Sequence, residues 1–369
     1  MAIGNCVIMQ SEQDLNHFYF KYSKARQNFL NAAIEEATFI RSWQHPLRGI
    51  AGEKLYLDLA WFGDRTAKKV LLTIAGIHGV EGYCGSGIQV GSIRTKWHQQ
   101  ADKDVAIVMI HGLNPYGMSH LRRVNEDGID LNRNFLDFSQ PLPNNALYDD
   151  LAEVIVPPQW TEETQVETLD RLTEYLSQSP SAVADLAKGQ YQYWYAPFYG
   201  GEVPTWSNRL FNLICDRYLQ DCRAVGLLDY HTGLGQYATG QLMSMPNDAT
   251  EDLASKIWGD KLVVVGSENS VATYTPYGTL LATLQNKLAN SVCVAAVYEF
   301  GTIPEHEVFH ALRADHWLYL HGYLNTQQAI EIKQKMLDAF YCDRADWQKS
   351  ICNLAFEAQA ELLTGLRSL

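Results

Sequence analysis

The sequence has no CxxC pair and only seven cysteines in 369 residues. Several of these cysteines lie inside apolar segments, and their number is odd. A disulfide framework would need an even, regularly spaced set, so the pattern indicates buried, reduced thiols in a reducing compartment.

The sequence also lacks a basic stripe and a long apolar run. There are 29 Lys and Arg against 42 Asp and Glu, a net charge of −13, which argues against a nucleic-acid partner. No segment approaches the roughly 18 apolar residues that a membrane helix needs. The first residues have neither the basic lead nor the apolar stretch of a secretory signal. These absences predict a soluble, cytoplasmic protein.

Short apolar runs alternate with segments of helical periodicity. Residues 70–75, 105–110, 224–230 and 292–300 are continuous apolar runs typical of buried strands. The alternation predicts the α/β class, with three layers (α/β/α) and a mixed, largely parallel central sheet. The length is sufficient for one large domain.

We expect a single catalytic domain built from three successive parts. A helical lead-in spans residues 1–45, with a helix predicted over 11–42. A core at 46–330 carries an insertion at 136–205, rich in proline, short amphipathic helices and aromatic residues. Helices at 331–369 end the chain.

Residues typical of a metal site follow three of the apolar runs. His78 and Glu81 come directly after 70–75, His231 after 224–230, and Glu299 near the end of 292–300. The carboxyl ends of parallel strands meet at one edge of a sheet, so these side chains can converge. Two His and one Glu can fill three positions of a tetrahedral zinc site, leaving the fourth for water. A further carboxylate can take a proton from that water, which predicts a hydrolase with one Zn²⁺.

Several short motifs occur in a fixed order along the chain. They are HGVEG, LNPYG, RRVNE, DLNRNF, YGG followed by WSN, YHTGLG and EFGT. With these motifs the chain resembles the zinc carboxypeptidase (carboxypeptidase A-like) superfamily. It looks most like a bacterial branch of unassigned function, related to the succinylglutamate desuccinylase and aspartoacylase group. The resemblance covers roughly residues 45–320.

The resemblance implies a role for each matching residue of the predicted metal site. His78, Glu81 and His231 would hold zinc. Glu299 would be the general base and would then return the proton to the leaving amine. Asp130 would accept a hydrogen bond from the first ligand histidine and fix its tautomer.

The resemblance also implies residues that bind the substrate. Arg123 would polarise the scissile carbonyl, although the adjacent Arg122 is an alternative. Asn132 and Arg133 would grip a substrate carboxylate, a contact that suits the forked guanidinium group. The implied substrate is a small peptide or an acyl-amino acid with a free carboxylate, cleaved at the neighbouring amide by carboxypeptidase-type or deacylase action.

A tyrosine from the segment before Glu299 would cap the bound substrate in this superfamily. Tyr277 is the preferred candidate and Tyr274 the alternative. The aromatic residues at 191–199 either rim the cleft or pack inside the insertion. We expect the insertion to shape the substrate pockets.

A competing metal motif lies further along the chain. His306, Glu307 and His310 match HExxH, with two histidines on one helix face and a glutamate base. His316 extends the match towards the metzincin pattern, but that pattern needs Gly where Arg313 stands. An HExxH-type zinc metalloprotease is therefore the rival hypothesis. The simpler HExxH enzyme would need a third ligand on a later helix, for which Glu331 is nominally available.

Two classes other than a zinc hydrolase fit the sequence less well. A non-catalytic binding protein on the same scaffold would be expected to have lost a ligand or the base, and none is lost here. A serine hydrolase is disfavoured because the segment CGSG around Ser86 lacks the GxSxG pattern.

Overall fold

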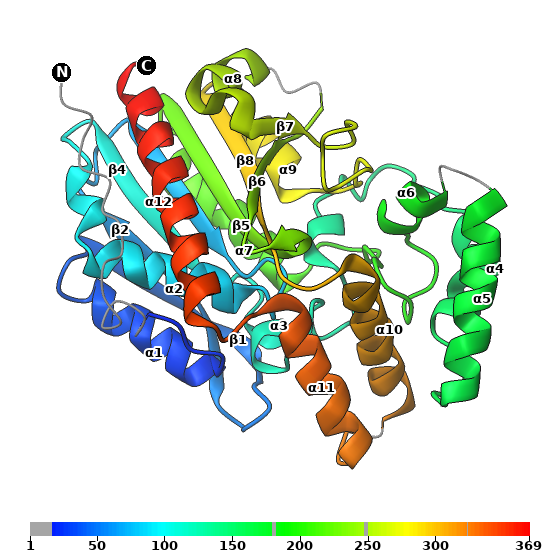
Figure 1. Cartoon of the computed structure of the whole chain (residues 1–369). Helices are drawn as coiled ribbons and strands as arrows, with labels where there is room; N and C mark the ends of the chain where they lie inside the picture. Colours follow the sequence, from blue (N-terminus) through cyan, green and yellow to red (C-terminus); the bar gives the residue numbers. More distant parts are fainter. Residues whose placement is uncertain (1–16, 179–181, 247–249, 323) are drawn as a thin grey trace.

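One sheet of eight strands organises the chain (Figure 1). The computed structural model describes residues 17–178, 182–246, 250–322 and 324–369, so the first 16 residues of the predicted lead-in lie outside it. The strand order across the sheet is β1-β2-β4-β3-β5-β8-β6-β7. The strands are β1 (Phe39–Arg48), β2 (Lys54–Phe62), β3 (Lys69–Ala75), β4 (Val105–His111), β5 (Ala224–Tyr237), β6 (Gly240–Ser244), β7 (Leu262–Val264) and β8 (Val292–Gly301).

The middle of the sheet is parallel and both flanks contain antiparallel pairs. Strands β4, β3, β5 and β8 run parallel to one another. Strand β2 pairs antiparallel with β1 and β4, and β6 pairs antiparallel with β8. The predicted mixed, largely parallel sheet is confirmed. The four adjacent parallel strands in its middle are the continuous apolar runs, as expected for strands buried on both faces. At the edge of the sheet, β6 and β7 also pair parallel.

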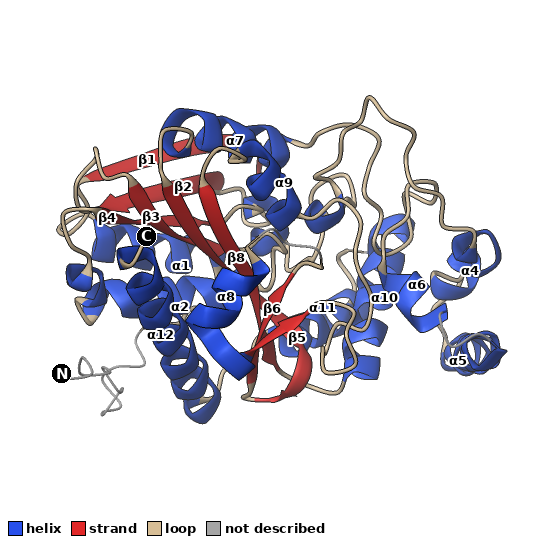
Figure 2. Ribbon diagram, turned by 90° about the horizontal axis from the view of Figure 1, so that it is seen from above, coloured by secondary structure: helices blue, strands red, loops and turns tan. Residues whose placement is uncertain are grey.

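Helices cover the sheet on both sides (Figure 2). Along β3, Leu71 packs with α1, α2 and α12, whereas Val70 and Leu72 pack with α7 and α9 on the opposite face. Successive strand residues point to opposite faces, so each central strand contributes to two separate cores. The three-layer α/β/α architecture is confirmed.

Twelve α-helices are described, and none of them combines the length and apolar character that crossing a membrane requires. They are α1 (Tyr22–Ala33), α2 (Gly82–Arg94), α3 (Pro115–Ser119), α4 (Leu147–Ile155), α5 (Glu162–Gln178), α6 (Ala182–Ala187), α7 (Trp206–Ile214), α8 (Glu251–Trp258), α9 (Leu280–Lys287), α10 (Glu305–His321), α11 (Gln327–Phe340) and α12 (Ala345–Arg367).

The helix predicted over 11–42 is wrong at its carboxyl end. Helix α1 ends at Ala33, and the chain then enters β1, which pairs with β2 from the register Phe39 to Trp61. Strand β1 lies at the edge of the sheet and most of its side chains are exposed or only half-buried. An edge strand of this kind has no apolar alternation that would reveal it in the sequence.

The insertion at 136–205 lies to one side of the sheet. It contains α4, α5 and α6, which stand beside α10 in both views (Figures 1 and 2). The short helices predicted in the insertion are present as α4, α5 and α6, and the residues between α5 and α6, 179–181, lie outside the described part of the chain. The insertion therefore stands next to the carboxyl ends of β5 and β8, where α10 begins.

Candidate active site

His78 and Glu81 lie in the tight turn that joins β3 to α2. Gly76 takes a left-handed conformation there, with φ +81°. A side chain on Gly79 would overlap the backbone of Gly117, so the turn packs directly against the following loop. The backbone N–H of Gly79 donates to the carbonyl of Arg123 at 3.0 Å. Glycine at these positions allows the turn to approach the loop that carries the predicted substrate arginines.

His231 and Glu299 are direct neighbours across two parallel strands. They form a register pair between β5 and β8, and both are buried. His231 lies beside the β3–α2 turn, and its ring centroid is 4.8 Å from that of His78. The convergence predicted from strand topology is therefore present.

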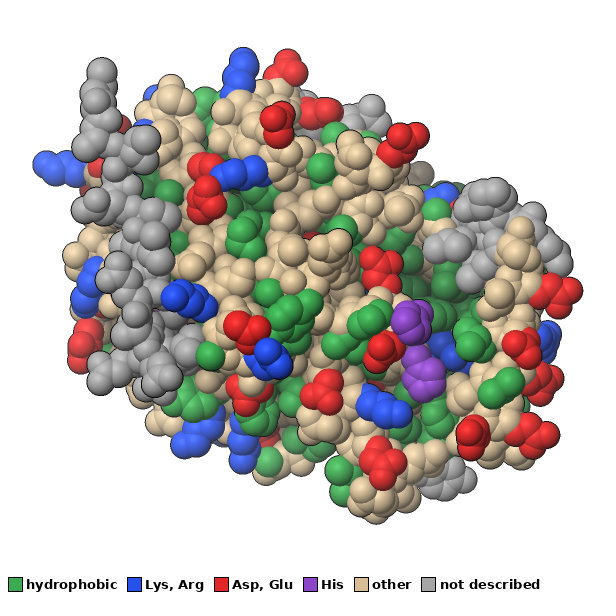
Figure 3. All heavy atoms as spheres, in the orientation of Figure 1, with side chains coloured by type: hydrophobic (Ala, Val, Ile, Leu, Met, Phe, Trp, Pro, Cys, Tyr) green, Lys and Arg blue, Asp and Glu red, His purple; other side chains and the backbone are tan. Residues whose placement is uncertain are grey.

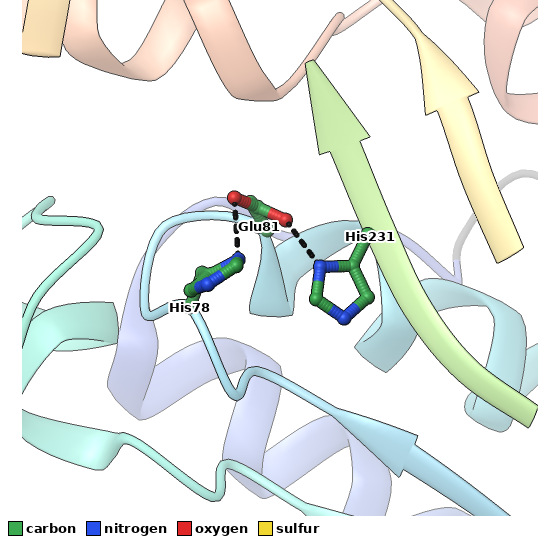
Figure 4. A group of neighbouring side chains, drawn as sticks. All are labelled: His78, Glu81 and His231. Atoms are coloured by element: carbon green, nitrogen blue, oxygen red, sulfur yellow. Dashed lines mark ion pairs between the residues drawn. The ribbon is translucent and has the colours of Figure 1, made fainter. Parts of the chain in front are cut away.

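His78, Glu81 and His231 form a group that could hold a metal ion, because their ligand atoms lie within 4.8 Å of one another (Figure 4). Nδ1 of His78 lies 2.9 Å from one carboxylate oxygen of Glu81, and Nδ1 of His231 lies 3.4 Å from the other. The Nδ1 atom of His78 is buried and has no hydrogen bond in the described structure. Two inward-facing imidazole nitrogens and one carboxylate match the donor set that zinc prefers.

The electrostatics of this group also fit a cation. Burial alone would raise the pKa of Glu81, but the charges of His78 and Arg123 outweigh it and hold that pKa well below its usual range. Burial would lower the pKa of His231, yet the carboxylate of Asp229 raises it well above its usual range. Buried carboxylates thus stabilise positive charge at the position that a metal ion would occupy.

A carboxylate stands behind each imidazole. Nε2 of His78 is 3.0 Å from Asp130, and Nε2 of His231 is 2.9 Å from Asp229. Such contacts fix the tautomer that leaves Nδ1 free to bind a metal. The position of Asp130 agrees with its predicted role. Asp229 was not predicted, although residues two apart on a strand share a face and the segment DYH contains that signal.

Glu299 lines the same space from the end of β8 and is 6% exposed. Its carboxylate accepts a hydrogen bond from the backbone N–H of Leu234 at 3.1 Å. Burial, together with the negative charge of Glu81, raises the pKa of Glu299 to about 8. A carboxyl group with a pKa this near neutrality can both accept and return a proton.

The two adjacent arginines have different surroundings. Arg123 donates to Glu81 at 2.7 Å and to Asp130 at 3.0 Å, and it lines the cavity at the metal group. Arg122 points the other way, donates to Asp315 at 2.9 Å and stacks on the ring of Tyr319 at 3.5 Å. Of the two alternatives, the geometry favours Arg123 as the residue next to a substrate.

Asn132 and Arg133 lie in a short helical turn (Leu131–Arg133) and also line the cavity. The guanidinium of Arg133 donates to the backbone carbonyls of Asn132 (2.8 Å) and Ala187 (2.6 Å). Arg133 is 2% exposed and forms no ion pair with a described carboxylate, although its charge helps to lower the pKa of Asp130. A buried cation without a direct ion pair would be stabilised by an anion from a ligand.

The structure separates the two candidate tyrosines. Tyr277 is 38% exposed and does not line the cavity. Tyr274 does line it, and its ring centroid is 5.9 Å from the guanidinium carbon of Arg133. The preference for Tyr277 is therefore not supported by its position, and Tyr274 is the better placed of the two.

The residues of the competing HExxH motif do not converge with a third ligand. His306 and Glu307 are exposed in the first turn of α10, and His310 packs its ring against Trp160 at 5.4 Å. Helix α10 continues through Arg313, and His316 points to the backbone carbonyl of Tyr195. In the described part of the chain, the metal-capable group is the one formed by His78, Glu81 and His231.

A cavity of about 940 Å³ joins these features. It is lined by His78, Arg123, Arg133, His231 and Glu299, and it extends to residues of α5 and α10. The lining is mainly apolar. Arg123, Arg133 and Glu299 line it near the metal-capable group, and further charged side chains line it from α5, α10 and α11. This arrangement is typical of a binding site for a small molecule.

The fold and the site together define a three-layer α/β protein of the carboxypeptidase-like type, with a His–Glu–His group at the carboxyl edge of its sheet. The chain belongs to the DUF2817 family, described as a protein of unknown function, whose sequence profile matches residues 18–353. The comparison with curated proteins gave no match.

Several solved structures resemble this chain at low sequence identity. A crystal structure of thrombin-activatable fibrinolysis inhibitor matches with a TM-score of 0.53 and 12% identity, over 99% of this chain and 79% of that one. A metallo-carboxypeptidase from Pseudomonas aeruginosa matches with a TM-score of 0.43 and 11% identity, over 90% and 68%. An aspartoacylase family protein from Mesorhizobium loti matches with a TM-score of 0.38 and 15% identity, over 79% and 69%. The first of these likenesses supports the fold, which agrees with the resemblance seen in the sequence.

Proposed function

We propose that the protein is a zinc-dependent hydrolase that cleaves an amide bond next to a free carboxylate. The substrate would be a small peptide or an N-acyl amino acid. The observation that carries the proposal is that three buried features line one cavity: the two histidines of the His–Glu–His group, the carboxyl group of Glu299, and Arg133, which forms no ion pair with a described carboxylate.

His78, Glu81 and His231 would hold the ion, oriented by Asp130 and Asp229. Bound zinc supplies Lewis acidity, which makes water more acidic and an amide carbonyl more electrophilic. A cation at this group also favours the ionised form of Glu299, because opposite charges stabilise each other.

The protein's own residues would carry out the remaining steps. The carboxylate of a substrate binds Arg133, with Asn132 beside it, which positions the neighbouring amide. Glu299 removes a proton from the attacking water as its oxygen bonds to the carbonyl carbon, and Arg123 donates to the carbonyl oxygen. Glu299 then gives the proton to the amide nitrogen as the C–N bond breaks. The products are a carboxylic acid and an amine, so water is the only co-reactant.

The test is a hydrolysis screen of the zinc-loaded protein. Each peptide or N-acyl amino acid is offered both as the free acid and as its C-terminal amide. We expect kcat/KM to favour the acids by about 10–100-fold, the effect of charge-assisted hydrogen bonds to Arg133. Arg133→Met should lower activity on the acids and bring the acid-to-amide ratio close to one.

Glu299→Gln provides the matching control for the chemical step. This variant should keep its zinc and lose about 10²–10⁴-fold in kcat, because amide nitrogen cannot act as the base. Full activity of Glu299→Gln on an authentic substrate would show that another group is the base. Bound zinc without hydrolysis of any member of a broad screen would favour the non-catalytic alternative.

A further inference from the structure

The cavity at the metal-capable group continues into a groove between two helices. On α5, Val166, Leu169 and Leu172 line it, and on α10, Val308 and Leu312 do so. The spacing of three residues on α5 and four on α10 places each set on one helix face. Figure 3 shows hydrophobic side chains on both sides of the hollow in this part of the molecule.

The α5 wall of the groove has an apolar strip, flanked by the polar side chains of Glu162, Gln165 and Thr173, and part of this strip is open to solvent. Val166 is 57% exposed and Leu169 is 61% exposed, whereas Leu172, one turn further on, is 4% exposed. Exposed side chains of this size on one face of a helix gain free energy when an apolar group covers them. Charged and imidazole side chains of α10 also line the cavity. Those of its first turn are exposed to solvent, whereas Arg313 is buried and donates to the backbone carbonyl of Ile155.

The groove is continuous with the predicted site of cleavage. The side chain of Val308 lies beside Gly233, two residues after His231 on β5. In the same cavity, Asn132 accepts a hydrogen bond from the backbone N–H of Leu280, which holds the proposed carboxylate-binding residues against the start of α9. A substrate held there by its carboxylate extends its other half past the metal-capable group and towards α5 and α10.

The walls of the groove determine what kind of group can lie there as the other half of the substrate. Both are α-helices, whose backbone N–H and C=O groups are bonded within each helix except at the ends. A peptide chain laid between them would bury amide groups without backbone partners, which is unfavourable. An aliphatic chain has no such groups beyond the scissile carbonyl and gains from every methylene that it buries.

We infer that the protein is a deacylase for N-acyl amino acids with a long aliphatic acyl chain, which lies in the groove between α5 and α10. The inference rests on the proposed hydrolase function and names its substrate class. Hydrolysis of such a substrate releases a fatty acid from the groove and a free amino acid from the Arg133 side, and it consumes one water molecule.

The test uses one amino acid carrying acetyl, octanoyl or dodecanoyl groups, and dipeptides with alanine or leucine in place of the acyl group. For the zinc-loaded full-length protein we expect kcat/KM to increase with chain length, by up to about fourfold for each methylene that is buried. The dodecanoyl compound should exceed the leucine dipeptide. A dipeptide preferred over every acyl compound would overturn the inference in favour of a peptidase.

Substitutions in the exposed wall make the test specific to the groove. Leu169→Asp should lower kcat/KM for the dodecanoyl compound by about tenfold, through KM, and leave the acetyl compound unchanged. Leu213→Asp on α7 is a matched control, because Leu213 is also an exposed helical leucine (46%) but lies outside the cavity lining. Because both side chains are exposed, neither change removes core packing.

Binding separates failure of this inference from failure of the proposed function. Calorimetry with Glu299→Gln should show tighter binding of the dodecanoyl than of the acetyl compound, and Leu169→Asp added to that variant should remove the difference. Cleavage of the acetyl compound without any dependence on chain length, in rate or in binding, refutes the acyl groove and leaves the hydrolase intact. Length-dependent binding without cleavage of any compound refutes the hydrolase and keeps the groove.

Discussion

The chain contains two histidine–glutamate motifs that each suggest zinc, and only one of them forms a buried group. His78 and Glu81 lie in a tight turn, are nearly inaccessible to solvent, and meet His231 from another strand. His306 and Glu307 are exposed on the first turn of α10. The difference lies in what surrounds each motif, because carboxylates support both imidazoles of the first group. A spacing pattern in a sequence predicts ligands only when other elements bring partners to it.

The largest effect is expected from removing one imidazole from each motif. His78→Ala should reduce bound zinc from one ion per chain to almost none, because two ligands cannot hold zinc tightly. His310→Ala should leave the zinc content unchanged. Elemental analysis after dialysis measures both. Loss of zinc from His310→Ala alone would reverse the comparison and establish the rival motif as the metal site.

The adjacent Arg122 and Arg123 provide a second comparison, because we expect the first to stabilise the fold and the second to act in catalysis. Arg122→Met should destabilise the fold by about 3 kcal/mol, because it removes one partner of the buried Asp315 and leaves it to Lys333. Arg123→Met should lower kcat by about 100-fold through the lost contact with the carbonyl oxygen. Denaturant unfolding and steady-state kinetics measure the two effects. Equal losses of kcat in the two variants would contradict the assignment to Arg123.

Replacing Asp229 tests whether the carboxylate that contacts the imidazole of His231 is what distinguishes the buried metal-capable group from the exposed HExxH motif. Asp229→Asn should weaken zinc binding by about 10–100-fold, since the amide supports His231 less strongly than the carboxylate does. Asp338→Asn is the control, because Asp338 also lines the cavity and its carboxylate accepts a hydrogen bond from Gln334. Competition with a chelator gives the affinities. Equal zinc affinities in the two variants would show that Asp229 does not support zinc binding.

The smallest expected effect is a pH dependence of the free energy of unfolding, compared between variants of Glu299 and of Glu307. Burial raises the pKa of Glu299 to about 8. Between about pH 4.5 and 8 this carboxyl group is therefore ionised in the unfolded chain but still protonated in the folded protein. The free energy of unfolding of the metal-free protein thus falls as the pH rises through this range. Glu299→Gln cannot ionise, so it should be more stable than the parent at pH 8, and this difference should shrink as the pH falls to 4.5. Glu307→Gln, the same substitution at the exposed glutamate of the HExxH motif, is the control variant. Thermal unfolding of both variants in chelator across this pH range is the measurement.

The sequence predicts the centre of the molecule better than its edges. The four parallel strands are buried on both faces and are therefore continuous apolar runs, which made β3, β4, β5 and β8 recognisable. Edge strand β1 and the short β6 are partly exposed and were not predicted. The convergence of His78, His231 and Glu299 follows from strand topology alone.

Details that depend on loop conformation could not be derived in the same way. Arg122 and Arg123 are adjacent in sequence, and only the path of the loop decides which one faces the cavity. The same holds for Tyr274 and Tyr277, three residues apart in an irregular segment. The apolar face of α5 shows helical spacing in the sequence, but its position opposite α10 depends on tertiary packing.

Asp130 touches three parts of the site with one carboxyl group. One oxygen receives the ring of His78 and the backbone N–H of Asn132, and the other receives Arg123. Any replacement there would disturb the proposed metal ligand and the proposed substrate-binding residues together, so this position leaves little freedom for change by mutation. In the described structure, no α5 residue forms a hydrogen bond with that carboxyl group. Directed evolution towards new substrates should therefore begin on α5 and leave Asp130 unchanged.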